Sequence, residues 1–215
     1  MSDSENLVRV PNPDKVNLSS HMKSYAEYQP QARGSVNERI EIIRAERRHI
    51  AGIAEMRVQR DGVDFQIVSQ KLHATFDEME THPDKHCVLA AEHFGGLVGF
   101  GRVGFIPTNS IGGAYGMPEG WYLTGTIVKP EYRRQGVGRR LCAERIKWIS
   151  QFSNSAFYMA NARNKPSIRL HEEFGFKEIG RKFGLPGLTF QGGEGVLFET
   201  RLDRSPNHWR NKGQV

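Results

Sequence analysis

The segment from Val128 to Leu141 constrains the fold more than any other part of this 215-residue chain. An apolar, strand-like stretch at 121–128 runs directly into a basic turn with two glycines, and a helix-like stretch follows from Gly138. Gly136 and Gly138 let the backbone approach a ligand closely, because they carry no Cβ atom. The N–H groups that open a helix lack partners within it and carry partial positive charge. The turn therefore predicts an anion site, with a pyrophosphate as the expected occupant.

Four arginines surround this turn and add full positive charges: Arg133, Arg134, Arg139 and Arg140. Guanidinium groups match the geometry of phosphate oxygens. The turn is neither a P-loop, which needs Gly-Lys-Ser/Thr, nor a Gly-x-Gly-x-x-Gly dinucleotide fingerprint. On the turn alone, an ordinary basic helix N-terminus is the competing interpretation.

Residues 161–176 form a second informative segment, in which a strand end, a short helix and Gly-Phe follow one another. Asn164 can cap the helix, and a proline is tolerated in its first turn. Asn164, Ser167 and His171 fall on one helix face, and Gly175 is placed to end the helix.

Together the two segments resemble the GNAT superfamily of acetyl-CoA-dependent N-acetyltransferases. Arg133, Gly136 and Gly138 match its Arg-x-x-Gly-x-Gly pyrophosphate loop, and 161–176 matches its second coenzyme A element. The resemblance covers most of residues 38–202 and is strongest over 121–176. The run Pro-Ser-x-Arg-Leu-His-Glu at 166–172 is closest to the phosphinothricin-type branch.

This resemblance implies that acetyl-CoA is the co-substrate and that no metal takes part. The coenzyme would lie between the strands at 121–128 and 156–160, with its pantetheine arm on the backbone of the first strand. The cofactor-binding residues expected on this basis are Ile127, Val128, Arg133, Arg134, Gln135, Gly136, Val137, Gly138, Arg139, Asn164 and Ser167.

His171 is the first catalytic candidate, because it follows Leu170 where most of the superfamily carries a tyrosine that donates to the sulfur. An imidazolium, which titrates near ~6.5 in model peptides, can protonate a leaving thiolate, and a neutral ring can donate a hydrogen bond. Simple packing beside the pantetheine arm is the alternative, and both stay open.

The sequence does not determine the general base. Phosphinothricin-type members place a glutamate on the strand before the phosphate loop, where this chain has Leu123. Glu92 and Glu119 are the candidates in its place, with Glu194 as a third, although such a glutamate is more often a solvated charge than a base. A water chain to backbone carbonyls is a further alternative.

Apolar periodicity predicts the strands and helices of a mixed α/β fold. The resemblance implies their GNAT-like arrangement in three layers, in which about four helices flank a mostly antiparallel sheet of six to seven strands. The expected strands are a short one at Ile40, then 87–92, 97–106, 121–128, 157–160, 177–180 and 196–202. The expected helices are 46–60, 64–80, 138–150 and 165–174, and loops are expected at 107–120 and 183–195. The apolar stripe of the second helix is Phe65, Val68, Leu72, Phe76 and Met79.

Composition and termini set the remaining expectations. Residues 37–203 read as one domain, between a flexible extension at 1–36 and a polar tail at 204–215. The net charge of +6 suits either nucleic acid or a phosphorylated ligand, but no zinc finger or RNP motif accompanies it, so no nucleic-acid partner is expected. The chain has no apolar run of ~20 residues, no signal-peptide pattern and only two cysteines, which favours a cytoplasmic protein without a membrane partner.

The expected activity is transfer of an acetyl group to a primary amine of a small molecule, such as an amino acid, a polyamine or an amine antibiotic. The amine would attack directly in a ternary complex. Two alternatives stay open: a protein N-terminus or lysine as acceptor, and a coenzyme A-binding module without turnover. A homodimer is compatible with the pattern.

Overall fold

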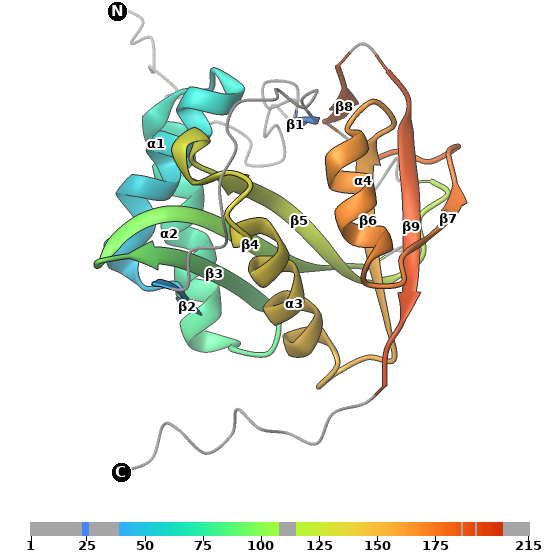
Figure 1. Ribbon diagram of the computed structural model, residues 1–215, viewed down its shortest axis with the longest axis horizontal. Coiled ribbons are helices and arrows are strands. Elements are labelled where there is room, and N and C mark those ends of the chain that lie inside the picture. Colours follow the sequence, from blue (N-terminus) through green and yellow to red (C-terminus); the bar gives the residue numbers. More distant parts are fainter. Residues whose placement is uncertain (1–22, 26–38, 108–114, 186, 192, 204–215) are drawn as a thin grey trace, which may run out of the picture.

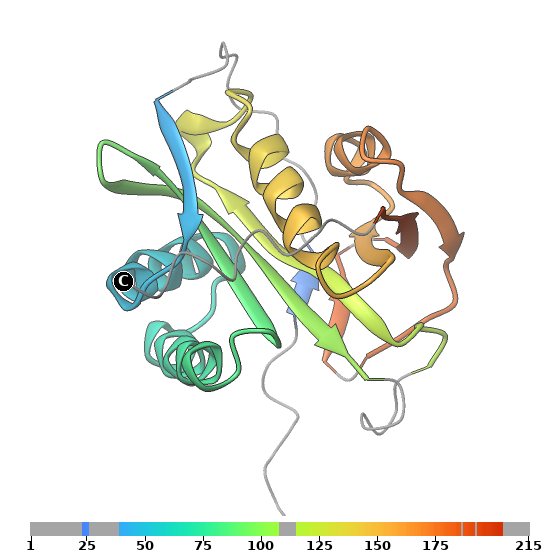
Figure 2. The same cartoon turned by 90° about the horizontal axis from the view of Figure 1, so that it is seen from below.

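A computed structural model describes residues 39–107, 115–185, 187–191 and 193–203, together with the backbone of 23–25. Its centre is a seven-stranded sheet with helices on both faces (Figure 1). Helices α1 and α2 cover one face, and α3 and α4 cover the other (Figure 2). The predicted mixed α/β architecture is confirmed.

The sheet has the strand order β2-β3-β4-β5-β6-β9-β7, and every neighbouring pair is antiparallel except β5 with β6. Its strands are β2 Ile40–Arg44, β3 His86–His93, β4 Gly96–Ile106, β5 Gly120–Val128, β6 Ser155–Asn161, β7 Lys177–Gly180 and β9 Gly195–Arg201. The helices are α1 Ile50–Asp61, α2 Phe65–Thr81, α3 Val137–Ile149 and α4 Lys165–Glu172, with 3-10 turns at Arg47–His49 and Pro130–Tyr132.

A second, two-stranded sheet joins β1 Lys23–Tyr25 to β8 Leu188–Phe190 in parallel. Both strands lie where the sequence predicts none, in the N-terminal extension and in the loop at 183–195. Three-residue strands are too short to leave a periodic signal, so their pairing comes from tertiary contact. The other residues of 1–36, residues 108–114 of the predicted loop and the tail at 204–215 lie outside the described residues.

Alternation along the strands divides the core between the two faces of the sheet. On β3, Cys87 and Leu89 pack with α3, whereas Val88 and Ala90 pack with α1 and α2. The predicted stripe of α2 is buried at Val68, Leu72, Phe76 and Met79, but Phe65 opens the helix and is 36% exposed. Asp64 caps this helix by accepting a hydrogen bond from Ile67 N–H.

The helix expected at 46–60 begins later than its sequence pattern indicates. His49 N–H donates to Glu46 O at 2.9 Å, which is an i to i+3 contact, and Glu46 N–H donates to His49 Nδ1 at 2.8 Å. These two bonds hold residues 47–49 in a 3-10 turn, so that α1 starts at Ile50.

Candidate active site

Strands β5 and β6 separate within the sheet. They are paired only at Tyr122 with Phe157 and at Leu123 with Tyr158. Beyond this point, here called the fork, β5 continues along β4 while β6 continues along β9 (Figure 1). In the described part of the chain, residues 124–128 of β5 therefore have no strand on the side of β6. Such a strand edge offers N–H and C=O groups to an extended ligand.

A β-bulge lies in β5 directly after the fork. Phe100 pairs with Ile127 and Arg102 with Thr124, so Gly125 and Thr126 together face the single residue Gly101. Gly125 has a φ of +55°, a left-handed conformation that costs a glycine little. The bulge bends the strand and redirects its edge at this point.

Two carbonyl groups of β5 are directed toward the open edge. Arg60 Nη1 donates to Thr126 O at 3.4 Å, and Arg133 Nε donates to Val128 O at 3.2 Å. Ile127 O lies on the β4 side instead, because a Cβ atom on Gly99 would stand 3.1 Å from it. The carbonyl groups of Thr126 and Val128 thus lie on the side of the open edge, whereas the side chain of Ile127 is buried beneath α1 and α2. Cofactor binding by Ile127 and Val128 stays a prediction.

The turn between β5 and α3 carries the backbone geometry of an anion site. Arg134 and Gly136 both adopt positive φ, at +61° and +80°, and Gly136 is the N-cap of α3. The first helical bond runs from Arg140 N–H to Gly136 O, so the N–H groups of 137–139 have no acceptor within the helix. Successive N–H groups in such a turn form a concave anion-binding nest.

Side chains around the turn divide into anchors and exposed charges. Arg133 binds Val128 O, Arg140 binds Ile40 O, and Gln135 Nε2 donates to Glu131 O at 2.7 Å. Val137 is buried, and Gly138 lies against Leu170 of α4. Arg134 is exposed, so its charge stands beside the N-terminus of α3. Arg139 is also exposed, but its Nε donates to Glu173 Oε2 at 3.0 Å.

The polar side chains on one face of helix α4 are held by contacts within the protein. Asn164 Oδ1 accepts a hydrogen bond from Ser167 N–H at 3.2 Å, which is the predicted cap. Ser167 Oγ lies 2.5 Å from the hydroxyl of Tyr158 on β6. Asn164 and Ser167 thus have partners within the chain, and a cofactor role for either one stays a prediction.

His171 stacks on Tyr158, with ring centroids 3.5 Å apart and an interplanar angle of 4°. The residue is 3% exposed, and its Nδ1 lies 2.8 Å from Ser167 O. Since a carbonyl only accepts, Nδ1 carries the proton and Nε2 holds a lone pair. Nε2 is buried and has no hydrogen-bond partner among the residues that the structure describes.

Burial lowers the pKa of His171 to about 3, and the charge of Arg145 acts in the same direction. The ring is therefore neutral near pH 7, and its only N–H group is already bonded to Ser167 O. The geometry offers neither donor role expected from the sequence: the imidazolium is absent, and the nitrogen without a partner can only accept.

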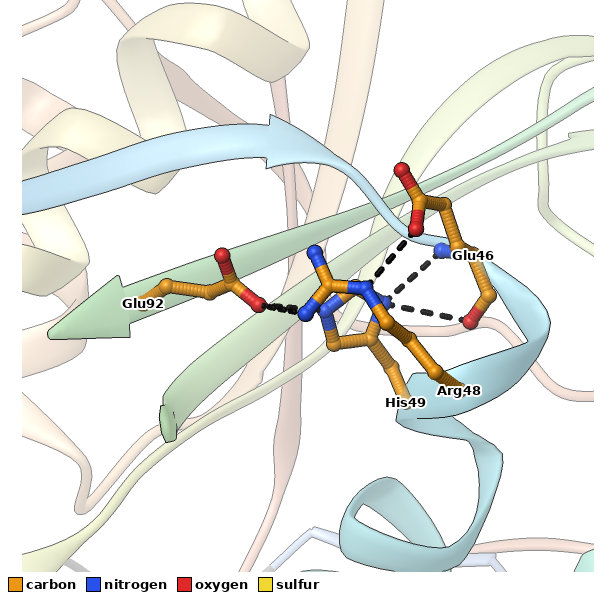
Figure 3. A network of polar contacts seen from close by, with 4 residues as sticks. All are labelled: Glu46, Arg48, His49 and Glu92. Atoms are coloured by element: carbon orange, nitrogen blue, oxygen red, sulfur yellow. Dashed lines mark hydrogen bonds and ion pairs between the residues drawn. The ribbon is translucent and has the colours of Figure 1, made fainter. Parts of the chain in front are cut away.

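Glu92 is part of a polar cluster beneath the start of α1 (Figure 3). Its Oε1 accepts from His49 Nε2 at 2.8 Å and from Arg48 Nη1 at 2.5 Å. Arg48 and then His49 lower the pKa of Glu92. On the other side of the ring, His49 Nδ1 lies 2.8 Å from Glu46 N and 3.1 Å from Glu46 O, so both ring nitrogens have partners (Figure 3).

This geometry does not suit Glu92 as a general base. Glu92 is 8% exposed, its carboxylate is held by two donors, and β4 lies between it and the open edge of β5. Its visible role is to anchor the 3-10 turn and α1 on β3.

The other two carboxylates are exposed. Glu119 precedes β5 at the end remote from the bulge, five residues before Thr124, or on the order of 16 Å along an extended strand. Glu194 precedes β9 beside the end of β6, where its carbonyl accepts from Ala162 N–H. Arg181 Nη1 lies 2.8 Å from the Glu194 carboxylate. Glu119 therefore lies away from the fork, and Glu194 lies on the β6 side of it.

Residues 41–176 match the Acetyltransferase (GNAT) family. The chain belongs to this family. It is accordingly an acetyl-CoA-dependent acyltransferase. The fork, the bulged strand and the turn lie within the matched residues, as does all of α4. A search of curated proteins found no match.

Solved structures share the fold at low sequence identity. A ribosomal-protein-alanine N-acetyltransferase from Brucella melitensis is 21% identical, with 75% of this chain and 99% of that one covered and a TM-score of 0.58. The structure of yncA from Salmonella typhimurium, solved with its cofactor acetyl-CoA, is 17% identical, covers 79% of this chain and 98% of its own, and has a TM-score of 0.59. A spermidine N-acetyltransferase from Vibrio cholerae, solved with CoA and spermine, is 16% identical, with 78% of this chain and 98% of that one covered and a TM-score of 0.56.

Two residues near the fork were missed by sequence reasoning. Tyr158 lies on β6 at the last pair before the fork and carries the ring on which His171 stacks. Arg145 lies on α3 and is only 1% exposed. The spacing Leu141, Arg145, Ile149 was the available signal, because residues four apart share a helix face and the two outer ones are apolar.

No helix among the described residues is long and apolar enough to cross a membrane. Within the same part of the chain, no group of three or more His, Cys, Asp or Glu side chains could hold a metal ion.

Proposed function

We propose that this GNAT enzyme acetylates a primary amine of a small molecule, of the amino acid, polyamine or amine antibiotic class, in a ternary complex. The observation that carries the proposal is the open, bulged edge of β5 leading directly into the turn at 133–139. In the reaction, the amine nitrogen forms a bond to the acetyl carbon, the C–S bond breaks, and the proton lost by nitrogen ends on sulfur. Bound acetyl-CoA supplies the activated acetyl group.

The residues around the fork suit this co-substrate. Thr126 and Val128 present carbonyl groups that could orient amide N–H groups of a pantetheine arm, because a carbonyl oxygen can accept a second hydrogen bond. The amides at the start of α3, with the exposed Arg134, suit a diphosphate, and Arg139, which is paired with Glu173, lies beside them. The buried Nε2 of His171, which has no partner in the described part of the chain, suits a ligand group that donates a hydrogen bond.

A small acceptor is favoured by how the segments beside the fork are joined. Tyr115 and Gly184 exchange two backbone hydrogen bonds, at 3.1 and 3.0 Å. Met117, Tyr122, Phe157 and Phe183 form an apolar cluster behind this bridge. An extended peptide would need free backbone to pair with, and the bridge occupies it at this position. The phosphinothricin-type branch stays a prediction based on residues 166–172.

The experiment is a calorimetric titration with acetyl-CoA, followed by turnover with a thiol reagent over amino acids, polyamines, amine antibiotics and peptides with a free N-terminus. Wild-type protein should bind acetyl-CoA and release free thiol with a small amine. If it does not bind acetyl-CoA, the proposal is wrong. If only peptides are acetylated, the small-molecule acceptor is wrong.

Arg134→Glu tests the location of the diphosphate. The variant should weaken acetyl-CoA binding by roughly tenfold or more, because a charge-assisted contact becomes a repulsion. Lys147→Glu is the matched control: it makes the same change of charge on α3, ten residues after Val137 and on the order of 15 Å away. Equal affinities for the two variants would contradict the placement.

A further inference from the structure

Four aromatic rings meet where α3 ends, and together they are here called the aromatic patch: Phe105 of β4, Trp121 of β5, Trp148 of α3, and Phe152 just after α3. The ring centroid of Trp121 lies 5.2 Å from that of Phe105 and 5.1 Å from that of Trp148. The ring of Phe152 lies 5.8 Å from Trp121 and 4.8 Å from Trp148. Aromatic pairs attract one another at such separations when their rings are edge-on or tilted, so the four rings form one group.

The aromatic patch is buried at its centre and open at its margin. Trp121 and Trp148 are 9% and 8% exposed, whereas Phe105 and Phe152 are 40% and 38% exposed. Neighbouring apolar groups that stay exposed on a protein surface mark a place of contact. Within the described residues, the two outer rings thus keep surface that a further apolar side chain could cover.

The described part of the chain ends beside this patch. Leu202 N–H donates to Asn154 O at 2.8 Å, and the side chain of Leu202 packs against the core cluster that contains Trp121. Asn154 follows Phe152 by two residues, which is at most ~7 Å along the chain. Asp203, the last described residue, is exposed. The chain therefore continues from a point close to the open margin of the patch.

The residues that follow supply a suitable side chain. Residues 204–215 read Arg-Ser-Pro-Asn-His-Trp-Arg-Asn-Lys-Gly-Gln-Val, so Trp209 is the only Phe, Tyr or Trp among them. Trp209 comes six residues after Asp203, and six extended residues span up to ~20 Å. This reach is sufficient to bring its ring to Phe152.

Tethering favours this side chain over one from a second copy of the protein. A group held a few residues from its contact is present at an effective concentration on the order of millimolar. An indole also offers a large apolar surface with few rotatable bonds, and its N–H group can remain in water at the edge of a contact.

We propose that the segment after β9 folds back on the aromatic patch, with the ring of Trp209 packed at the open margin beside Phe152. The contact is one of the chain with itself. It lies at the C-terminal end of α3, whereas the turn at 133–139 lies at the other end of this helix, about 20 Å away along its axis.

Fluorine NMR of the full chain labelled with fluorotryptophan tests the proposal. The chain has three tryptophans, Trp121, Trp148 and Trp209, so three resonances are expected, and Trp209→Phe identifies the third. In the wild type, the Trp209 resonance should be shifted from that of a labelled peptide of residues 204–215, because the rings of the patch shield or deshield a docked indole. Phe152→Ser should move this resonance to the peptide position.

The matched control is Phe94→Ser, which removes a phenylalanine that is 79% exposed in the hairpin between β3 and β4. It should leave the Trp209 resonance in place. The resonances of Trp121 and Trp148 report in the same spectra that each variant is folded.

Dilution separates a contact within one chain from a contact between copies. The proposal predicts the same Trp209 resonance at every protein concentration. A resonance that moves to the peptide position on dilution would overturn it in favour of a second copy. A wild-type resonance already at the peptide position, or one that stays shifted in Phe152→Ser, would overturn it as well. Acetyl-CoA takes no part in these measurements, so their failure would leave the proposed function untouched.

Discussion

At the scale of single residues, burial decides which chemistry His171 can perform. The sequence placed this side chain on the correct face of α4, next to Ser167, but not its tautomer or its protonation state. Those depend on the Ser167 carbonyl, the Tyr158 ring and the Arg145 charge, which come from α4, β6 and α3. Such contacts between elements are not encoded in any local pattern.

The lowered pKa of His171 predicts how its contribution to stability depends on pH. Its folded-state pKa of about 3 lies below the ordinary value, so the unfolded chain binds the proton more readily. The contribution of this residue is therefore present above about pH 6.5 and is lost progressively as the pH falls toward 3. His171→Phe should flatten the acid side of a stability–pH profile measured by urea unfolding. An unchanged slope between pH 6 and 4 would contradict a buried neutral ring.

The contacts of Glu92 predict that its substitution lowers stability and leaves catalysis unchanged. Glu92→Gln should lower the free energy of unfolding by about 2 kcal/mol, because it removes the charge that His49 and Arg48 contact. Its lowered pKa means that this contribution is present above the ordinary glutamate pKa and is lost as the pH falls through the folded-state value.

The matched control is Glu41→Gln, an exposed residue directly across from Glu92 on β2, which should change stability by less than about 0.5 kcal/mol. Acetyl-CoA affinity should be unchanged in both variants. If Glu92→Gln abolished turnover while leaving stability intact, Glu92 would have to be restored as a catalytic candidate.

At the scale of elements, the bulge in β5 bends the strand and sets the direction of its open edge. The strand expected at 121–128 gave no position for the bulge, although a glycine inside a strand, here Gly125, is a signal for one. A two-against-one pairing depends on the register of β4, which sequence periodicity does not specify.

Gly125→Ala tests this element. A side chain at a φ of +55° should cost about 1 kcal/mol of stability, and straightening the edge should weaken acetyl-CoA binding. Gly104→Ala on β4 is the control, since a Cβ atom there would meet nothing within 4 Å and its φ is not positive. Equal effects on acetyl-CoA affinity would show that the bulge does not shape the binding edge.

At the scale of the whole molecule, long periodic segments and connected motifs allowed the architecture to be predicted. The stripe of α2, the hairpin of β3 and β4 and the strand–turn–helix at 121–150 each carried their own signal. The pairing of β1 with β8 and the buried Arg145 did not, because each exists only through contacts between distant parts of the chain. The identity of the acceptor amine and the formation of a homodimer stay predictions.

The central claim is that acetyl-CoA lies along the open edge of β5 with its diphosphate at the start of α3. Hydrogen–deuterium exchange with and without acetyl-CoA tests it most directly, through peptides that cover 124–139 and, as a control, 86–93 of β3. The account predicts slower exchange over 124–139 and no change over 86–93. Unchanged exchange at 124–139 under saturating acetyl-CoA would contradict it.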